Sequence, residues 1–157
     1  MKIKLIVVGK TDATYIQEGI TAYLSRLKHY IKFELEVIPD IKSRKNKTEI
    51  QQKEEEGQQI LKKLDAGDWL VLLDENGKAM SSVAFSEFIE QKMIQSVKTL
   101  VFIIGGPYGF SQEVYGRANQ KLALSKMTFS HQMVRLFFVE QVYRAFTILK
   151  KEPYHHQ

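Results

Sequence analysis

Three short segments of the 157-residue chain have residue types that can bind a ligand or do chemistry. They are Leu73-Asp74, the glycine-rich stretch 105–109 and the stretch 124–131. Glycine adopts positive φ and lets bare backbone approach a ligand, so stretch 105–109 is either a ligand-binding loop or an ordinary turn between a strand and a helix. It lacks the G-x-G-x-x-G spacing of dinucleotide-binding loops and the G-K-[ST] ending of phosphate-binding loops. A nicotinamide or nucleoside-triphosphate enzyme is therefore disfavoured.

Two pairs of polar residues near the C-terminus have helical spacing. His131 and Arg135 are four residues apart at the start of an expected helix. Such a pair can face an anionic or nucleobase substrate, or it can simply form hydrogen bonds on the polar stripe of the helix. Glu140 and Arg144 repeat the spacing with the acid first, the order that favours a structural ion pair.

The composition excludes several other chemistries. The chain has no cysteine, which rules out disulfides, thiolate nucleophiles and zinc–thiolate sites. Its four histidines lack the spacing of metal-binding motifs, so we expect no metal. No apolar run is long enough to span a membrane, and the N-terminus is too weakly apolar for a signal peptide. We therefore expect a single cytoplasmic domain over residues 1–157, with a net charge of +5 that suits a polyanionic partner.

The elements that position these residues alternate along the chain. Short β-branched or apolar runs predict strands at residues 3–8, 33–37, 69–73, 100–104 and 122–124. Apolar residues at helical spacing predict helices at about 16–27, 48–64, 81–93, 111–118 and 131–150. Thr48 and Gln51 have the spacing of a capping box. The third helix can be capped by Ser81 or Ser82, and the fourth by Ser111. Residues 75–77 have turn chemistry that should end the third strand.

Five strands alternating with five helices indicate an α/β fold, with a mainly parallel sheet and helices on both faces. In such sheets, ligands bind at the carboxyl ends of the strands. Each of the three candidate segments follows a predicted strand. We therefore expect all three at one edge of the sheet.

Two basic segments are candidates for contacts with phosphate. The loop at residues 40–47 carries four cations and either grips phosphates or is only solvated. The C-terminal tail, residues 150–157, mixes lysines with Tyr154, His155 and His156, a combination that suits unpaired RNA bases but also describes a frayed terminus. The cations of the loop are Lys42, Arg44, Lys45 and Lys47.

Along essentially its whole length the chain resembles the small SPOUT methyltransferases of the ribosomal RNA large subunit methyltransferase H family. Each motif alone is weak, but their order and spacing together are highly specific. The motifs are Val7-Val8-Gly9-Lys10, Ile104-Gly105-Gly106-Pro107-x-Gly109, Leu124-Ser125-x-Met127-Thr128-Phe129-x-His131, Glu140-Gln141-x-Tyr143-Arg144-Ala145 and Pro153-Tyr154-His155.

The resemblance implies an α/β knot, in which the C-terminal part threads through a loop to form a trefoil. It also implies S-adenosylmethionine as the methyl donor and a homodimer with the cofactor site near its interface. The implied substrate is N3 of a pseudouridine in 23S rRNA, in the stem-loop at the subunit interface of the assembled ribosome. A SPOUT enzyme acting on tRNA and a non-catalytic ribosome-binding protein are the alternatives.

The resemblance also assigns residues to the site. On the substrate side, His131, Arg135 and Arg144 are the implied catalytic group, and Gly109, Tyr154 and His155 are the implied RNA contacts. The chain departs from the family pattern at Ser130, where proline is usual, and at its end, where His156 and Gln157 replace a basic residue. We expect a less rigid turn at Ser130. The implied cofactor contacts are Leu73, Gly105, Gly106, Leu124, Ser125, Lys126, Met127, Thr128 and Phe129.

The chemistry of the implied reaction suggests a role for each polar residue. N3 of pseudouridine carries an imide proton that must leave, and a nearby cation favours the resulting anion. We expect Arg135, or Arg144 from either subunit, to supply that charge. His131 is expected to position the base and is also a candidate proton acceptor.

Overall fold

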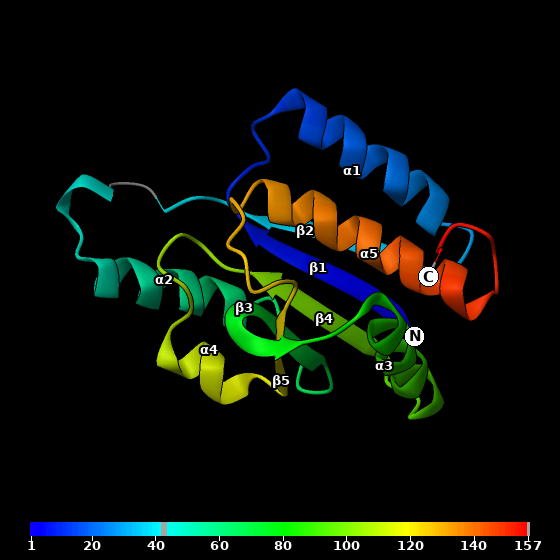
Figure 1. Cartoon of the computed structure of the whole chain (residues 1–157). Helices are drawn as coiled ribbons and strands as arrows, with labels where there is room; N and C mark the ends of the chain where they lie inside the picture. The colour runs from blue at the N-terminus through cyan, green and yellow to red at the C-terminus, as the bar shows by residue number, and fades with distance from the viewer. Residues whose placement is uncertain (42–43, 157) are drawn as a thin grey trace.

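The computed structural model describes residues 1–41 and 44–156, which form one five-stranded sheet covered by helices on both faces (Figure 1). Lys42 of the predicted basic loop lies outside the described residues. In chain order the elements are β1 (Lys2–Val8), α1 (Thr14–Leu27), β2 (Lys32–Ile38), the 3-10 helix η1 (Arg44–Asn46), α2 (Glu49–Leu61), β3 (Trp69–Ala79), α3 (Ser82–Ile94), β4 (Thr99–Ile104), α4 (Gln112–Arg117), β5 (Gln120–Ala123) and α5 (Met133–Leu149).

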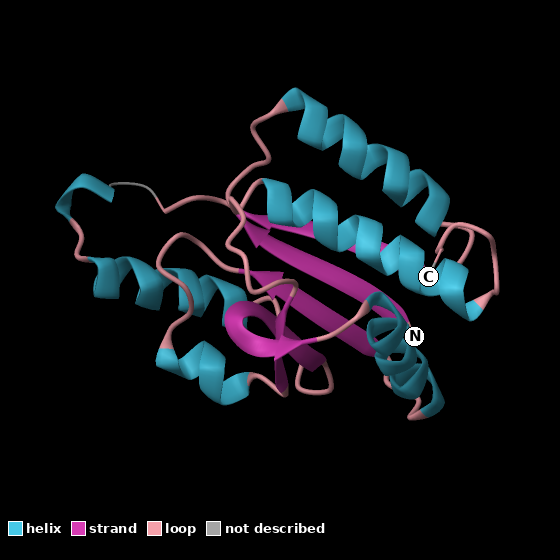
Figure 2. Ribbon diagram, viewed as in Figure 1, coloured by secondary structure: helices cyan, strands magenta, loops and turns pink. Residues whose placement is uncertain are grey.

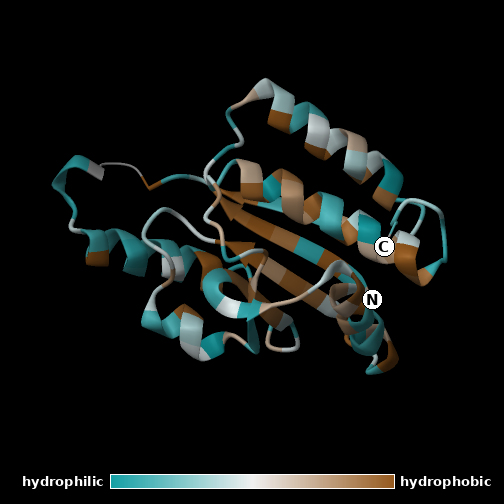
Figure 3. Ribbon diagram, viewed as in Figure 1, coloured by the Kyte–Doolittle hydropathy of each residue, from teal (hydrophilic) through white to brown (hydrophobic). Residues whose placement is uncertain are grey.

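The strands lie in the order β2-β1-β4-β3-β5, and all four neighbouring pairs are parallel. This confirms the predicted α/β class with a parallel sheet. β1 and β4 are brown along most of their length in Figure 3, and hydrophobic clusters cover both of their faces. Hydrophobic side chains therefore occupy consecutive positions in these strands rather than alternate ones.

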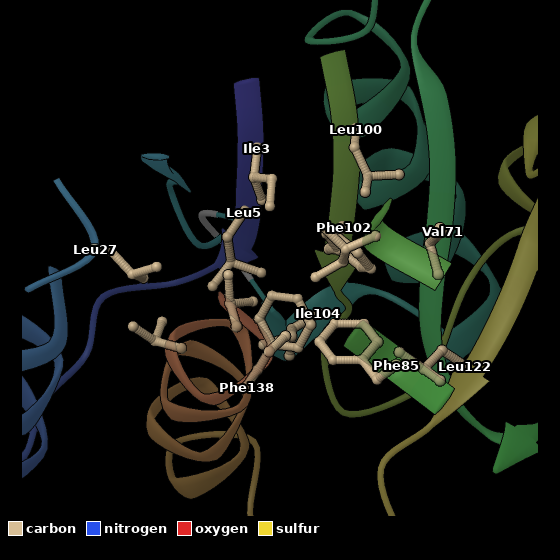
Figure 4. Close-up of a cluster of buried hydrophobic side chains, with 14 of the residues drawn as sticks. Ile3, Leu5, Leu27, Val71, Phe85, Leu100, Phe102, Ile104, Leu122 and Phe138 are labelled. Atoms are coloured by element: carbon tan, nitrogen blue, oxygen red, sulfur yellow. The ribbon is translucent and has the colours of Figure 1, made fainter. Parts of the chain in front are cut away.

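Two hydrophobic clusters fill the space between the sheet and its helices. Alternate residues of β1 enter opposite clusters, as strand geometry requires, with Leu5 on one face and Ile6 on the other. The larger cluster lies under α1, α3 and α5, where the rings of Phe102 and Phe138 have centroids 4.7 Å apart (Figure 4). The smaller cluster lies under α2 and α4.

The predicted helix caps are confirmed. Thr48 and Gln51 form the reciprocal capping box of α2. The Ser81 hydroxyl accepts a hydrogen bond from Ala84 N at the start of α3, and Ser111 caps α4 in the same way through Val114 N. These local bonds satisfy backbone donors that have no partner within the helix.

The prediction that residues 75–77 end the third strand is wrong. β3 continues to Ala79, and the chain bulges between Leu73 and Lys78, which both pair with Leu122 (Figure 2). Gly77 lies on β5 so closely that a Cβ there would stand 2.6 Å from the backbone of Leu122. The turn-forming residues 75–77 therefore lie in a bulge within β3 and do not end the strand.

Lysine–glutamate pairs line the β1–β2 edge of the sheet. Glu36 accepts Lys4 at 2.7 Å and Lys63 at 2.8 Å. The hydrogen bonds and positive charges of these two lysines lower the pKa of the Glu36 carboxyl below its usual range.

Candidate active site

A cavity of about 610 Å³ opens at the carboxyl ends of β3, β4 and β5. Strand register explains its position, because Leu73 pairs with both Ile104 and Leu122 and the residues that follow these strands meet at one edge. The three segments singled out in the sequence therefore come together, as predicted. The lining comprises Leu73 to Asn76, Ile104 to Phe110, Tyr115, Leu122 to Ser125, Met127 to His131 and Val134.

Ten of the predicted site residues line this cavity, and five do not. Those in the lining are Leu73, Gly105, Gly106, Gly109, Leu124, Ser125, Met127, Thr128, Phe129 and His131. Lys126 belongs to the same loop but is outside the lining, as are Arg135, Arg144, Tyr154 and His155. The structure thus separates the implied cofactor contacts from most of the implied substrate contacts.

The loop at residues 105–109 is held in a tight turn beside a buried carboxylate. Gly109 has φ of +78° and donates its N–H to Gly106 O at 3.2 Å. Glu56, on α2, is only 2% exposed, and a Cβ on Gly106 would stand 2.9 Å from its Oε1. A side chain at Gly106 would therefore clash with this carboxylate, so glycine is needed at 106 for close packing, whereas at 109 it is needed for the positive φ.

The loop that follows β5 carries its own hydrogen bonds. The Ser125 hydroxyl accepts from Met127 N at 2.9 Å, and the Ser130 hydroxyl accepts from Met133 N at 3.1 Å. Ser130 therefore fixes the entrance to α5 where the family pattern has proline. Contrary to prediction, α5 begins at Met133, so His131 lies in the preceding turn and not on the helix.

Asp74 and Tyr115 form a pair in the cavity wall that no sequence pattern predicts. The Tyr115 hydroxyl, on α4, donates to Asp74 Oδ2, and Asn76 N donates to Oδ1 at 2.8 Å. Burial raises the pKa of the Tyr115 phenol to about 12, and the bond to Asp74 adds to the effect. Forty-one positions separate the two residues. Only the packing of α4 beside the end of β3 brings them together.

Arg135 does not face the cavity. Its side chain is 1% exposed, and its guanidinium donates to Val8 O at 2.7 Å, Gly9 O at 2.9 Å and the Thr11 hydroxyl at 3.0 Å. Burial lowers the pKa of this guanidinium, while the nearby Asp12 carboxylate acts in the opposite direction. Arg135 thus ties the start of α5 to the end of β1. The structure does not support its expected contact with substrate.

Arg144 belongs to a second polar cluster, which holds the C-terminal tail against α5. Its Nε donates to Glu140 Oε1 at 3.0 Å, which confirms the expected structural ion pair. The Tyr154 hydroxyl donates to the same oxygen at 3.0 Å, and His155 Nδ1 lies 3.3 Å from the Arg144 guanidinium. Burial and the bonds to Tyr23 and Glu140 raise the pKa of Tyr154 well above its usual range. Tyr154 and His155 of the tail are therefore docked rather than frayed.

The charged residues of the cavity wall are acidic. Asp74 and Glu75 contribute carboxylates, and no lysine or arginine occurs among the lining residues that the structure describes. Within residues 1–41 and 44–156, no three His, Asp or Glu side chains are grouped so that they could hold a metal ion. In the same part of the chain no helix is both long and apolar enough to cross a bilayer. The cavity therefore suits a ligand that is neutral or cationic where it meets this wall.

Fold and cavity together define an α/β protein with a cavity at the carboxyl ends of its strands, the place where such sheets bind small ligands. Residues 1–155 match the family model described as predicted SPOUT methyltransferase. Proteins named ribosomal RNA large subunit methyltransferase H from Parabacteroides distasonis and Flavobacterium johnsoniae are 63% and 64% identical to this chain, over the full length of both chains in each comparison. The chain belongs to the SPOUT methyltransferase family and is a methyltransferase.

A solved structure shows the same fold at much lower sequence identity. It is that of a probable methylase family protein from Haemophilus influenzae, with a TM-score of 0.54 and 12% identity over 99% of this chain and 70% of that chain. Agreement at such low identity concerns the fold alone. The trefoil knot implied by the family resemblance stays a prediction.

Proposed function

We propose that this protein binds S-adenosylmethionine in the cavity at the strand ends and methylates N3 of a pseudouridine in 23S rRNA. The observation that carries the proposal is the make-up of the cavity wall, in which the described lining combines glycine-loop backbone with two carboxylates and no lysine or arginine, an arrangement that disfavours a polyphosphate ligand. Its volume of about 610 Å³ lies within the usual range for cofactor pockets. A compact adenosyl ligand with a net positive charge fits this wall.

The residues that would hold the donor come from the two loops of the cavity. Gly105 and Gly106 follow β4 and the segment 124–129 follows β5, so the two loops lie on either side of β3. When bound, the donor supplies a methyl group already activated by its sulfonium, so the protein needs no nucleophile or metal of its own. What these residues contribute is alignment, which alone accounts for a large part of the rate of such reactions.

His131 is the side chain best placed to meet the base, because it lines the cavity from the turn before α5. We assign it the positioning of the pseudouridine ring beside the donor. The hydrogen bonds from Arg135 to Val8 and Gly9 hold the start of α5, next to His131, against the end of β1. Arg135 therefore acts through the position of His131 rather than on the substrate. Replacing His131 with alanine should therefore lower transfer without lowering donor affinity.

Arg144, Tyr154 and His155 reach a cavity only if a second copy of the chain takes part. Along α5, Arg144 lies ten residues beyond Val134, which lines the cavity, and this corresponds to about 15 Å. We propose a homodimer in which this cluster of one subunit faces the cavity of the other. The exposed side chains of Met127, Phe129 and Phe137 next to the cavity supply apolar surface for such contact.

The proposed partner is 23S rRNA within the assembled ribosome, which places the protein in the cytoplasm. A net charge of +5 provides few phosphate contacts, so recognition of a composite ribosomal surface suits this chain better than binding of naked RNA. The relatives at 63% and 64% identity are named as enzymes of large-subunit rRNA, which favours rRNA over tRNA as the substrate.

The deciding experiment analyses rRNA and tRNA nucleosides by mass spectrometry in a strain that lacks this protein. Loss of N3-methylpseudouridine from 23S rRNA, and its return with the wild-type gene, is the expected result. Loss of a tRNA methylation instead would reassign the substrate. In vitro, purified protein should methylate assembled ribosomes from the deletion strain and leave purified 23S rRNA nearly unmodified. A protein that binds ribosomes but takes up no donor in calorimetry would be non-catalytic.

A further inference from the structure

Asp74 lies on β3, between the ends of the neighbouring strands β4 and β5. It directly follows Leu73, whose pairing partners Ile104 and Leu122 precede the two loops that build the cavity. Gly105 follows Ile104 in the same way, so Asp74 and Gly105 extend neighbouring strands into the cavity lining. A ligand in contact with the glycine loop is thus close to the Asp74 carboxylate.

The carboxylate of Asp74 is held in place by bonds from two directions. Tyr115 donates to Oδ2, and Asn76 N donates to Oδ1 at 2.8 Å. Because the pKa of Tyr115 is raised to about 12, its hydroxyl keeps its proton throughout the neutral range and the bond persists. A carboxylate has about four acceptor positions, so these two bonds leave acceptor capacity for a ligand.

The cavity lining holds the carboxylates of Asp74 and Glu75, while Lys121, outside the lining, has its Nζ 5.7 Å from the centroid of the Tyr115 ring. Asp74 is half-buried, whereas its neighbour Glu75 is exposed and therefore better screened by water and salt. No lysine or arginine is found among the lining residues within the described part of the chain. Of the two carboxylates in the described lining, that of Asp74 is therefore the less screened by solvent.

We propose that Asp74 is a specificity-determining residue that favours the methyl donor over its product, which lacks the sulfonium charge. The inference rests on the proposed binding of S-adenosylmethionine. That donor and S-adenosylhomocysteine have nearly the same shape, but the donor carries an additional positive charge at sulfur. A fixed carboxylate in a partly desolvated wall attracts the first more than the second. Transfer removes this charge, so the attraction weakens at the step after which the product must leave.

The test measures the affinities of both ligands by calorimetry. Asp74→Asn removes the charge and keeps an amide oxygen that can accept the hydrogen bond from Tyr115. This variant is expected to shift the ratio of donor to product affinity about tenfold towards the product, chiefly by weakening the donor. Asp74→Glu retains the charge and should keep most of the preference. Glu75→Gln, the matched control at an exposed neighbour, should change the ratio less than about twofold.

The outcomes separate this inference from the proposed function. If the wild type binds neither ligand, with or without ribosomes, then the proposed donor site is wrong. If the wild type binds both and Asp74→Asn leaves their ratio unchanged, only the role of Asp74 is overturned. Thermal unfolding of each variant shows whether it is folded. If Asp74→Asn does not fold, the comparison of Asp74→Glu with Glu75→Gln decides, because a loss of preference in the charge-retaining variant contradicts a charge-based mechanism.

Discussion

Replacing Arg135 with methionine should destabilise the protein strongly while leaving its donor site intact. Arg135 is 1% exposed, and its guanidinium donates to two backbone carbonyls, those of Val8 and Gly9, and to the Thr11 hydroxyl. Methionine fills much of the space of the aliphatic stem but donates no hydrogen bond. The carbonyls at the end of β1 then lose buried charged donors, and unsatisfied buried acceptors carry a desolvation cost.

The size of the effect follows from these contacts. A hydrogen bond from a charged donor contributes at least about 1.5 kcal/mol, so loss of the two bonds to carbonyls should cost about 3 kcal/mol. In a domain of this size, that loss lowers the melting temperature by roughly 6–12 °C. Arg26→Met is the matched control, because Arg26 is exposed and only stacks over Tyr23 and Tyr143 at 5.5 and 5.6 Å. Its cost should stay below about 1 kcal/mol.

Urea unfolding and calorimetry together provide the assay. The unfolding midpoint of Arg135→Met should fall with an unchanged m-value, which marks a change in stability alone. At a temperature well below its melting point, the variant should still bind S-adenosylmethionine with affinity near that of the wild type. A variant as stable as the wild type that had lost methyl transfer would refute this reasoning and return Arg135 to the substrate side.

Three further perturbations test other parts of the structure. Gly106→Ala should weaken donor binding at least about tenfold, because the added methyl group clashes with the Glu56 carboxylate. Adding Glu56→Ala should restore part of the affinity. Gly116→Ala is the control, because a methyl group there has no atom within 4 Å. Phe138→Ala, at a site 0% exposed, should cost about 3–5 kcal/mol in urea unfolding. Lys4 and Lys63 lower the pKa of the Glu36 carboxyl, so the contribution of Glu36 to stability is complete above pH 4.5, its usual pKa, and is lost as the pH falls below that value. Glu36→Gln should therefore flatten the loss of stability with falling pH.

The general layout of the fold follows from patterns confined to short stretches of chain. Apolar runs and helical spacing predicted five strands and five helices, and the capping box at Thr48 and the cap at Ser111 are confirmed. The error at residues 75–77 has a clear cause. The same turn chemistry fits a hairpin, a chain break or a bulge, and the choice depended on the pairing of Leu73 and Lys78 with Leu122, more than forty residues away.

The cavity was predictable in its position but not in its chemistry. Parallel strands end at a common edge, so strand order alone brings segments 73–74, 105–109 and 124–131 together. Which polar side chains face that edge was not predictable, because an arginine on a helix has the same sequence signature whether it meets a ligand or a backbone carbonyl. His131 faces the cavity, and Arg135, four residues later, turns towards β1.

The sequence by itself determined the α/β class, the boundaries of most elements and the methyltransferase family, because periodicity, caps and motif spacing are properties of neighbouring residues. Tertiary structure alone decided that Arg135 is buried against Val8, that Tyr115 fixes Asp74, and that Tyr154 of the tail docks against Glu140. The first of these contacts spans 127 positions and the second 41. Contacts over such distances depend on how whole helices pack on the sheet, which no local pattern specifies.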